Sequence, residues 1–176
     1  MVFERKNIHN IITTNYDEGI EIILCNKCGY KKLEKPEGLV PEEVFSIRTY
    51  KVFENSVLNH RVKLWQIHGN LERIKSITLG FDQYCASLSK LCSYLKGQYE
   101  SDKGPKCRIP MIEKYETQTF DGLSWAELFF YTNVYIVGFG MDFSEIDIWW
   151  LLNKRIRIKN RTSRLQNDIF YLYNEL

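Results

Sequence analysis

The chain has 176 residues, which is enough for one domain with a substantial core and hardly enough for two. Hydrophobic residues make up 44% of the sequence and charged residues 26%, a globular composition that excludes a disordered or fibrous protein. The net charge of +2 argues neither for nor against nucleic acid, and neither a membrane-spanning apolar run nor a secretory signal is present. Five scattered cysteines do not resemble a disulfide framework. We therefore expect a single domain over residues 1–176, soluble and cytoplasmic, with reduced thiols.

The first elements along the chain alternate between strand and helix. Residues 10–14, NIITT, favour a strand, and a short helix is expected from Asp17 to about Cys25 with acidic residues in its first turn. A second apolar, β-favouring run at residues 62–69, VKLWQIHG, predicts another strand that ends at a glycine.

The second half of the chain continues this alternation. Residues 81–97 predict a helix, because their apolar residues recur at helical spacing and a glycine follows. Residues 134–137 form an unbroken apolar strand. Ser144 and Asp147 have the spacing of a capping box for a following helix. Residues 168–173, DIFYLY, predict a last strand.

This order of elements predicts an α/β fold in which a parallel sheet lies between two layers of helices. In open parallel sheets, ligands bind beyond the carboxyl ends of the strands. Polar or glycine-containing segments follow three of the predicted strands, so all three are expected at one edge of the sheet. They are Asn15 to Asp17, His68 with Gly69, and Gly138 to Asp142.

Three segments, ITTNYD, QIHGN and VYIVGFGMDFSEID, occur in this order and resemble motifs of the SIR2-like, sirtuin-related domain, especially its bacterial branch of NAD-hydrolysing domains. The resemblance covers most of the chain from about residue 8 onward. In the first motif Thr14 stands where sirtuins have Gln and Tyr16 where they have Ile, whereas Asn15 and Asp17 match. The implied fold is a three-layer, Rossmann-like parallel sheet of the SIR2/DHS-like type.

The resemblance also implies a ligand and a reaction. NAD is the implied ligand and substrate, hydrolysed to nicotinamide and ADP-ribose, and in the bacterial branch this depletion of NAD often serves antiphage defence. Asn15 and His68 are the implied catalytic residues. The implied NAD-binding residues are Thr13, Thr14, Asp17, Gly69, Gly138, Gly140 and Asp142.

These residue types suit such chemistry on physical grounds. Nicotinamide carries a positive charge on its ring nitrogen in NAD and leaves without a general acid, through an oxocarbenium-like state. The amide of Asn15 can donate and accept, so it can hold a water or a ribose hydroxyl, and histidine at position 68 can accept a proton near neutral pH. Asp17 can hold the carboxamide or ribose or favour the developing positive charge. Gly69 and Gly138 allow close approach of the backbone to a cofactor.

The sequence also departs from the family in its phosphate-binding segment. The Gly-Ala-Gly phosphate-binding segment, which in the family lies well before the Asn motif, does not occur, and Gly138-Phe139-Gly140 is the only G-x-G. We therefore expect the chain to be the carboxyl-terminal part of a SIR2-like domain that lacks its first strand-loop-helix unit. Such a part would expose a central sheet edge, so we expect a homo-oligomer or a partner chain that supplies the missing half.

Each site residue also has a structural interpretation. Asn15 and Asp17 can form an Asx turn and a helix cap, His68 can be a satisfied core residue, and the glycines can serve only a tight turn. A non-catalytic interaction or assembly module is therefore the alternative function. Deacylation of a protein lysine is a third possibility, which the Thr at position 14 disfavours.

Two further patterns have simple interpretations. Cys25 and Cys28 resemble half of a zinc knuckle, but structural zinc takes four ligands and no second pair with this spacing occurs, so no metal is predicted. A basic stretch suits a solvated helix end, where cations complement the helix dipole, rather than a nucleic-acid surface. Its residues are Lys154, Arg155, Arg157, Lys159, Arg161 and Arg164.

Overall fold

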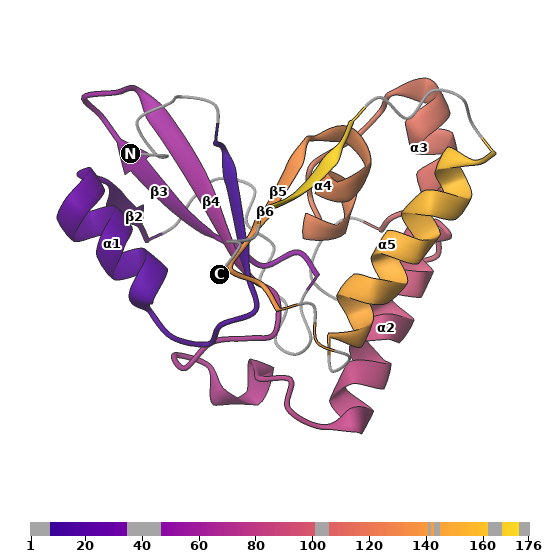
Figure 1. Ribbon diagram of the computed structural model, residues 1–176, viewed down its shortest axis with the longest axis horizontal. Coiled ribbons are helices and arrows are strands. Elements are labelled where there is room, and N and C mark those ends of the chain that lie inside the picture. The colour runs from indigo at the N-terminus through magenta and orange to yellow at the C-terminus, as the bar shows by residue number, and fades with distance from the viewer. Residues whose placement is uncertain are drawn as a thin grey trace. The chain divides into compact units, whose positions relative to one another are not determined.

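The computed structural model describes residues 8–34, 47–100, 106–140, 142, 145–161 and 167–172. The chain divides into two compact units, residues 1–79 and residues 80–176, each with its own sheet (Figure 1). No helix within these described ranges is both long and apolar enough to cross a membrane. The expectation of one domain over the whole chain stays a prediction.

The first unit is built on a mixed sheet of four strands in the order β1-β4-β3-β2. Strand β1 pairs parallel with β4, whereas β3 pairs antiparallel with both β4 and β2. Its elements are β1 (Asn10–Thr13), α1 (Gly19–Cys28), β2 (Lys31–Leu33), β3 (Lys51–Asn55), β4 (His60–Gln66) and the 3-10 helix η2 (Ile74–Ser76).

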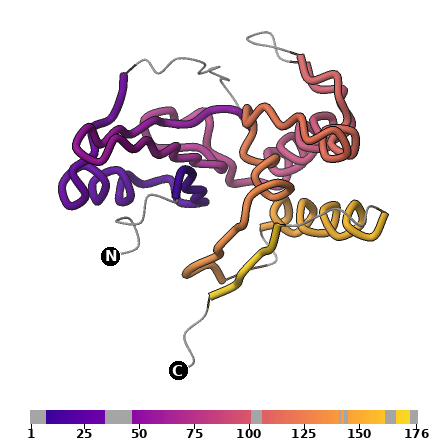
Figure 2. The backbone as a smooth tube through the Cα atoms, turned by 90° about the horizontal axis from the view of Figure 1, so that it is seen from above, coloured from indigo at the N-terminus to yellow at the C-terminus, as the bar shows by residue number. Residues whose placement is uncertain are grey.

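Helix α1 lies along one side of this sheet, as Figure 2 shows, and their apolar side chains form the core of the unit. Side chains alternate across the faces of a strand, so β4 places Val62 and Leu64 on the core side. The remaining members of the cluster are Leu24, Tyr30 and Phe53, with Ile11, Ile20 and Cys28 packed against them.

The mixed sheet corrects the expectation that all strands run parallel. Strands β1 and β4 are parallel as predicted, but β2 and β3 are antiparallel and were not foreseen. The four residues 56–59 between β3 and β4 are too few for a crossover, so the two strands form a hairpin. Asn55 stabilises the turn, because its Oδ1 accepts hydrogen bonds from the backbone N–H groups of Val57 at 3.1 Å and Leu58 at 3.0 Å.

The second unit contains four helices among its described residues and a separate pair of parallel strands, β5 and β6. Its elements are α2 (Phe81–Leu95), α3 (Met111–Thr117), α4 (Trp125–Tyr131), β5 (Val134–Val137), α5 (Ile146–Lys159) and β6 (Ile169–Leu172). The predicted helix in 81–97 and the strands at 134–137 and 168–173 are confirmed as α2, β5 and β6, with Tyr173 outside the described residues. Ser144 of the predicted capping box also lies outside them. The arrangement of helices in two layers around a sheet stays a prediction.

A buried polar cluster joins α2, α3 and α4 of the second unit. The side chain of Lys114 is 3% exposed and forms ion pairs with Glu127, which is 0% exposed, and with Asp121 at 2.8 Å. The hydroxyl of Tyr94 donates to Glu127 Oε1 at 2.8 Å. Burial, reinforced by the charge of Glu127, raises the pKa of Tyr94, so the hydroxyl stays a donor.

Arg155 corrects the interpretation of the basic stretch as a uniformly solvated helix end. Its side chain is buried, and its guanidinium donates to the backbone carbonyls of Phe129 at 2.9 Å and of Asn167. Asn167 Nδ2 donates to the same Phe129 carbonyl at 3.0 Å. Arg155 therefore joins α5 to the end of α4 and to the start of β6. The remaining described cations of the stretch are exposed except Lys154, and Arg164 lies outside the described residues.

Candidate functional site

Strands β1 and β4 bring the first two motifs to the same edge of the sheet. The last register pair between these parallel strands is Thr13 with Gln66, and the N–H of Ile67 continues the ladder to the carbonyl of Thr13 at 3.0 Å. Asn15 and His68 each stand two residues beyond that pair. The prediction that these two motifs lie at one edge of the sheet, beyond the carboxyl ends of their strands, is therefore confirmed.

Asn15 follows β1 with an exposed side chain. Its backbone N–H donates to the hydroxyl of Thr13 at 3.1 Å, while its side-chain amide makes no hydrogen bond to any residue that the structure describes. Thr14, between them, is half-buried. The amide of Asn15 can therefore act both as donor and as acceptor toward a ligand.

Asp17 is exposed and lies just before helix α1. Its Oδ1 accepts a hydrogen bond from the backbone N–H of Gly19 at 2.8 Å, which is the Asx turn of the structural interpretation. The helix begins at Gly19 rather than at Asp17 and extends to Cys28. One carboxylate oxygen of Asp17 thus serves the fold, and a role in binding stays a prediction.

His68 and Gly69 form a turn directly after β4. His68 is 1% exposed, and its carbonyl accepts from the N–H of Thr78 at 2.8 Å. Gly69 has a φ of +97°, and a Cβ on it would lie 2.5 Å from the Ser76 carbonyl carbon and 2.7 Å from Ile77 N. The glycine is required here by the close approach of the chain's own backbone, a reason that differs from the expected approach to a cofactor.

Hydrogen bonds also join the loop after β1 to the segment after β4. The backbone N–H of Leu71 donates to the carbonyl of Tyr16 at 3.2 Å, and the Tyr16 hydroxyl donates to the carbonyl of Thr78 at 2.8 Å. Gln66 Nε2 donates to the carbonyl of Asp17 at 3.0 Å. The sequence alone assigned no role to Tyr16, Gln66 or Thr78, although the first two lie within the quoted motifs.

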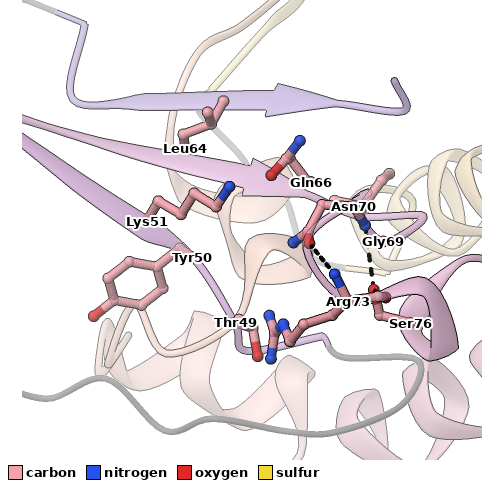
Figure 3. Close-up of a pocket in the computed structure, with 10 residues that line it drawn as sticks. Thr49, Tyr50, Lys51, Leu64, Gln66, Gly69, Asn70, Arg73 and Ser76 are labelled. Atoms are coloured by element: carbon pink, nitrogen blue, oxygen red, sulfur yellow. Dashed lines mark hydrogen bonds between the residues drawn. The ribbon is translucent and has the colours of Figure 1, made fainter. Parts of the chain in front are cut away.

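A small pocket lies beside the turn, between β3, β4 and the segment up to η2 (Figure 3). Its volume of about 20 Å³ is room for about one water molecule. Figure 3 shows Lys51 and Gln66 of neighbouring strands pointing toward one another beside it. Asn70 supports the turn that borders it, since its backbone N–H donates to Ser76 Oγ at 3.2 Å and its Oδ1 accepts from the backbone N–H of Arg73 at 3.0 Å.

Lys51 belongs to a network of two lysines and two glutamates on one side of this pocket. Lys51 pairs with Glu21 of α1 and, at 3.1 Å, with Glu72; Lys32 of β2 pairs with the same carboxylates at 3.2 Å and 2.8 Å. Hydrogen bonds from Lys32 and then Lys51 lower the pKa of Glu72. The network neutralises its own charges, so it supports the arrangement of α1, β2 and β3 rather than an anion site.

The third motif follows β5 in the second unit. Gly138 has a φ of +63°, and no atom of the described residues would lie within 4 Å of a Cβ on Gly138 or on Gly140. Asp142 is exposed, and its carbonyl accepts from Trp149 Nε1 at 3.1 Å. Gly138 therefore provides a left-handed turn. The place of this motif at the edge formed by β1 and β4 stays a prediction.

The two cysteines of the possible zinc knuckle, Cys25 and Cys28, lie on α1. All five cysteines of the chain are free thiols. Cys25 is exposed, whereas Cys28 packs against the core of the first unit, as a small apolar residue does. The expectation of reduced thiols stays a prediction.

Two parallel strands, β1 and β4, are followed by the polar residues Asn15 and His68. This arrangement is typical of α/β domains that bind ligands beyond the carboxyl ends of their strands. A protein-family model described as the SIR2-like domain matches residues 9–150, and the chain belongs to this family. The matched range includes residues of both compact units. No curated protein and no solved structure matches the chain.

Proposed function

We propose that this protein hydrolyses NAD to nicotinamide and ADP-ribose, with Asn15 and His68 as its catalytic residues. The observation that carries the proposal is the β1–β4 register, which places both residues two positions beyond the pair Thr13 and Gln66. Membership of the SIR2-like family supports NAD as the ligand.

The residues at this edge fit such a substrate. The exposed amide of Asn15 and the exposed carboxylate of Asp17 are groups that bind ribose hydroxyls and carboxamides. NAD supplies the bond that breaks, between its ribose and a nicotinamide that leaves without a general acid. Thr13, Thr14 and Gly69 are the further proposed NAD-binding residues of this unit, and Gly138, Gly140 and Asp142 are those of the second unit.

The protein's own contribution would be orientation and proton transfer. Asn15 holds a water or ribose hydroxyl through its amide, and His68 accepts a proton from that group. Asp17 favours the positive charge that develops on the ribose.

The test is release of nicotinamide from NAD by the wild type and by Asn15→Ala. Asn26→Ala is the matched control, because Asn26 is an exposed asparagine on α1 of the same unit. We expect turnover in the wild type and the control and a loss of at least about 100-fold in Asn15→Ala. Equal turnover in all three proteins, or no turnover by a folded wild type at any protein concentration tested, would refute the proposal.

A non-catalytic interaction or assembly module is the second candidate. The observations that favour it are the 1% exposure of His68 and the use of one Asp17 oxygen in the turn of α1. NAD binding without release of nicotinamide, or no NAD binding by calorimetry, would support this alternative.

We also propose that the reaction occurs in the bacterial cytoplasm as antiphage defence, performed by a homo-oligomer or with a partner chain. Family membership supports this setting. Bacteria that produce the wild type should lose NAD during phage infection, whereas those that produce Asn15→Ala should not. Unchanged NAD in both strains, despite turnover by the purified protein, would contradict the defence role.

A further inference from the structure

We propose that Tyr16 is a positioning residue, whose hydroxyl holds the Asn15 loop against the segment that carries His68. This inference rests on the proposed function, because it concerns the geometry of that site. It starts from the end of the β1–β4 ladder, which extends only to the bond between Ile67 N–H and the Thr13 carbonyl. Beyond this bond, strand pairing no longer controls the spacing of the two segments.

Tyr16 bridges the two segments at two separate points. Its carbonyl accepts from Leu71 N–H at 3.2 Å, just after the His-Gly turn, and its hydroxyl donates to the Thr78 carbonyl at 2.8 Å. Thr78 in turn donates its N–H to the His68 carbonyl at 2.8 Å. The contacts therefore run from the residue beside Asn15, through the single residue Thr78, to His68 itself.

The surroundings of this tie favour a defined geometry. Thr78 is 1% exposed and Tyr16 is half-buried, so water competes weakly for the hydrogen bond between them. Gln66 adds a second side-chain tie on the same loop through its bond to the Asp17 carbonyl at 3.0 Å. The side chain of Tyr16 connects the Asn15 loop to the segment that contains Thr78. Its hydroxyl makes the hydrogen bond to Thr78, and a change to phenylalanine removes this group while it keeps the ring.

The substitution Tyr16→Phe tests the inference because it removes the hydroxyl and retains the ring. We expect kcat for nicotinamide release to fall about tenfold while KM for NAD changes less than twofold, since the loop orientation changes and the groups that contact NAD remain. Tyr135→Phe is the matched control, because Tyr135 is 61% exposed on β5 and loses the same hydroxyl. This control should retain wild-type kcat and KM.

Amide hydrogen exchange gives a readout that does not depend on turnover. In Tyr16→Phe the N–H groups of Leu71 and Thr78 should exchange about fivefold faster, whereas those of Phe53 and Leu64 in the core should keep their wild-type rates. A general loss of stability would instead accelerate exchange at all four positions. Gln66→Met should produce the same local pattern, because it removes the other side-chain tie to the loop.

The outcomes separate the two proposals. Faster exchange confined to Leu71 and Thr78, together with a fall in kcat, supports the positioning role. Unchanged exchange, uniformly faster exchange, or an unchanged kcat in an otherwise active protein overturns it. If the wild type releases no nicotinamide, the proposed function fails, and the tie is then supported or overturned by the exchange result alone.

Discussion

The substitution Gly69→Ala should strongly destabilise the first unit. The φ of +97° at Gly69 is unfavourable for any side chain, which costs about 1–3 kcal/mol. The new Cβ would also lie 2.5 Å from the Ser76 carbonyl carbon and 2.7 Å from Ile77 N. These are backbone atoms that cannot rotate away, so overpacking adds about 1–3 kcal/mol. The two effects together lower the free energy of unfolding by about 2–6 kcal/mol.

Two other glycines provide graded controls for this prediction. Gly138 has a φ of +63°, and none of the described residues would touch a Cβ there, so Gly138→Ala should cost only the left-handed strain of about 1–2 kcal/mol. A Cβ on Gly140 would likewise meet no atom of the described residues, and this glycine has no left-handed φ, so Gly140→Ala should change stability by less than about 0.5 kcal/mol. Urea denaturation followed by circular dichroism measures all three variants against the wild type.

The result that would refute this reasoning is specific. A Gly69→Ala variant as stable as Gly140→Ala would show that the Ser76 backbone does not confine position 69. If that variant then lost NAD binding, the glycine would serve approach to a cofactor, as the sequence alone suggests. A large loss of stability that is greater than that of Gly138→Ala confirms the structural role.

Three further substitutions test the buried and charged contacts. Lys114→Met leaves the fully buried Glu127 without its cation and should cost about 3–5 kcal/mol in urea denaturation; a loss below about 1 kcal/mol would contradict the buried pair. Hydrogen bonds, the strongest of them from Lys32, hold the pKa of Glu72 below its ordinary value of 4.5. The Glu72 carboxylate therefore stabilises the fold above pH 4.5, and this stabilisation is lost as the pH falls below 4.5. Glu72→Gln should therefore flatten the acid side of a stability-against-pH curve, and an unchanged curve would count against the network. Arg155→Met removes the guanidinium that donates to the carbonyls of Phe129 and Asn167. It should lower the melting temperature by an amount equivalent to about 1–3 kcal/mol of stability. An unchanged melting temperature would mean that other donors replace the guanidinium.

Local signals account for the part of the fold that was predictable. The runs NIITT and VKLWQ combine β-favouring residues with polar residues at their ends, so the strands β1 and β4 and the motifs after them could be located. The helical spacing of apolar residues in α2 and the unbroken apolar run in β5 are equally local patterns.

Strands β2 and β3 lack such a signal. Strand β2 is three residues long and starts with two lysines, and β3 has only two apolar residues between Lys51 and Asn55. Their extended conformation depends on the pairing of β3 with β4 and of β2 with β3, and pairing is a property of the folded chain. The ENSVLN segment, with Asn55 capping its turn, was the one local sign of the hairpin.

The candidate site likewise has features that the sequence predicts and features that appear only in the folded chain. The residue types Asn15, Asp17 and His68 and their positions after apolar strands could be identified by inspection, as could their resemblance to SIR2-like motifs. The turn of Asp17 onto Gly19 was among the structural interpretations considered for that residue. The backbone contact that requires Gly69 was not, because Ser76 approaches it only in the folded chain.

The sequence by itself determined the family, the places of the two strands that end in polar motifs and the chemical groups those motifs offer, because each depends on neighbouring residues. Tertiary structure alone decided that β1 and β4 are adjacent and in the register that brings Asn15 level with His68. It also decided that Tyr16 reaches Thr78, 62 positions away, and that Arg155 is buried rather than solvated. The physical reason is that hydrogen bonds and burial between distant segments depend on how the chain packs, and local periodicity carries no information about which distant segment becomes the neighbour.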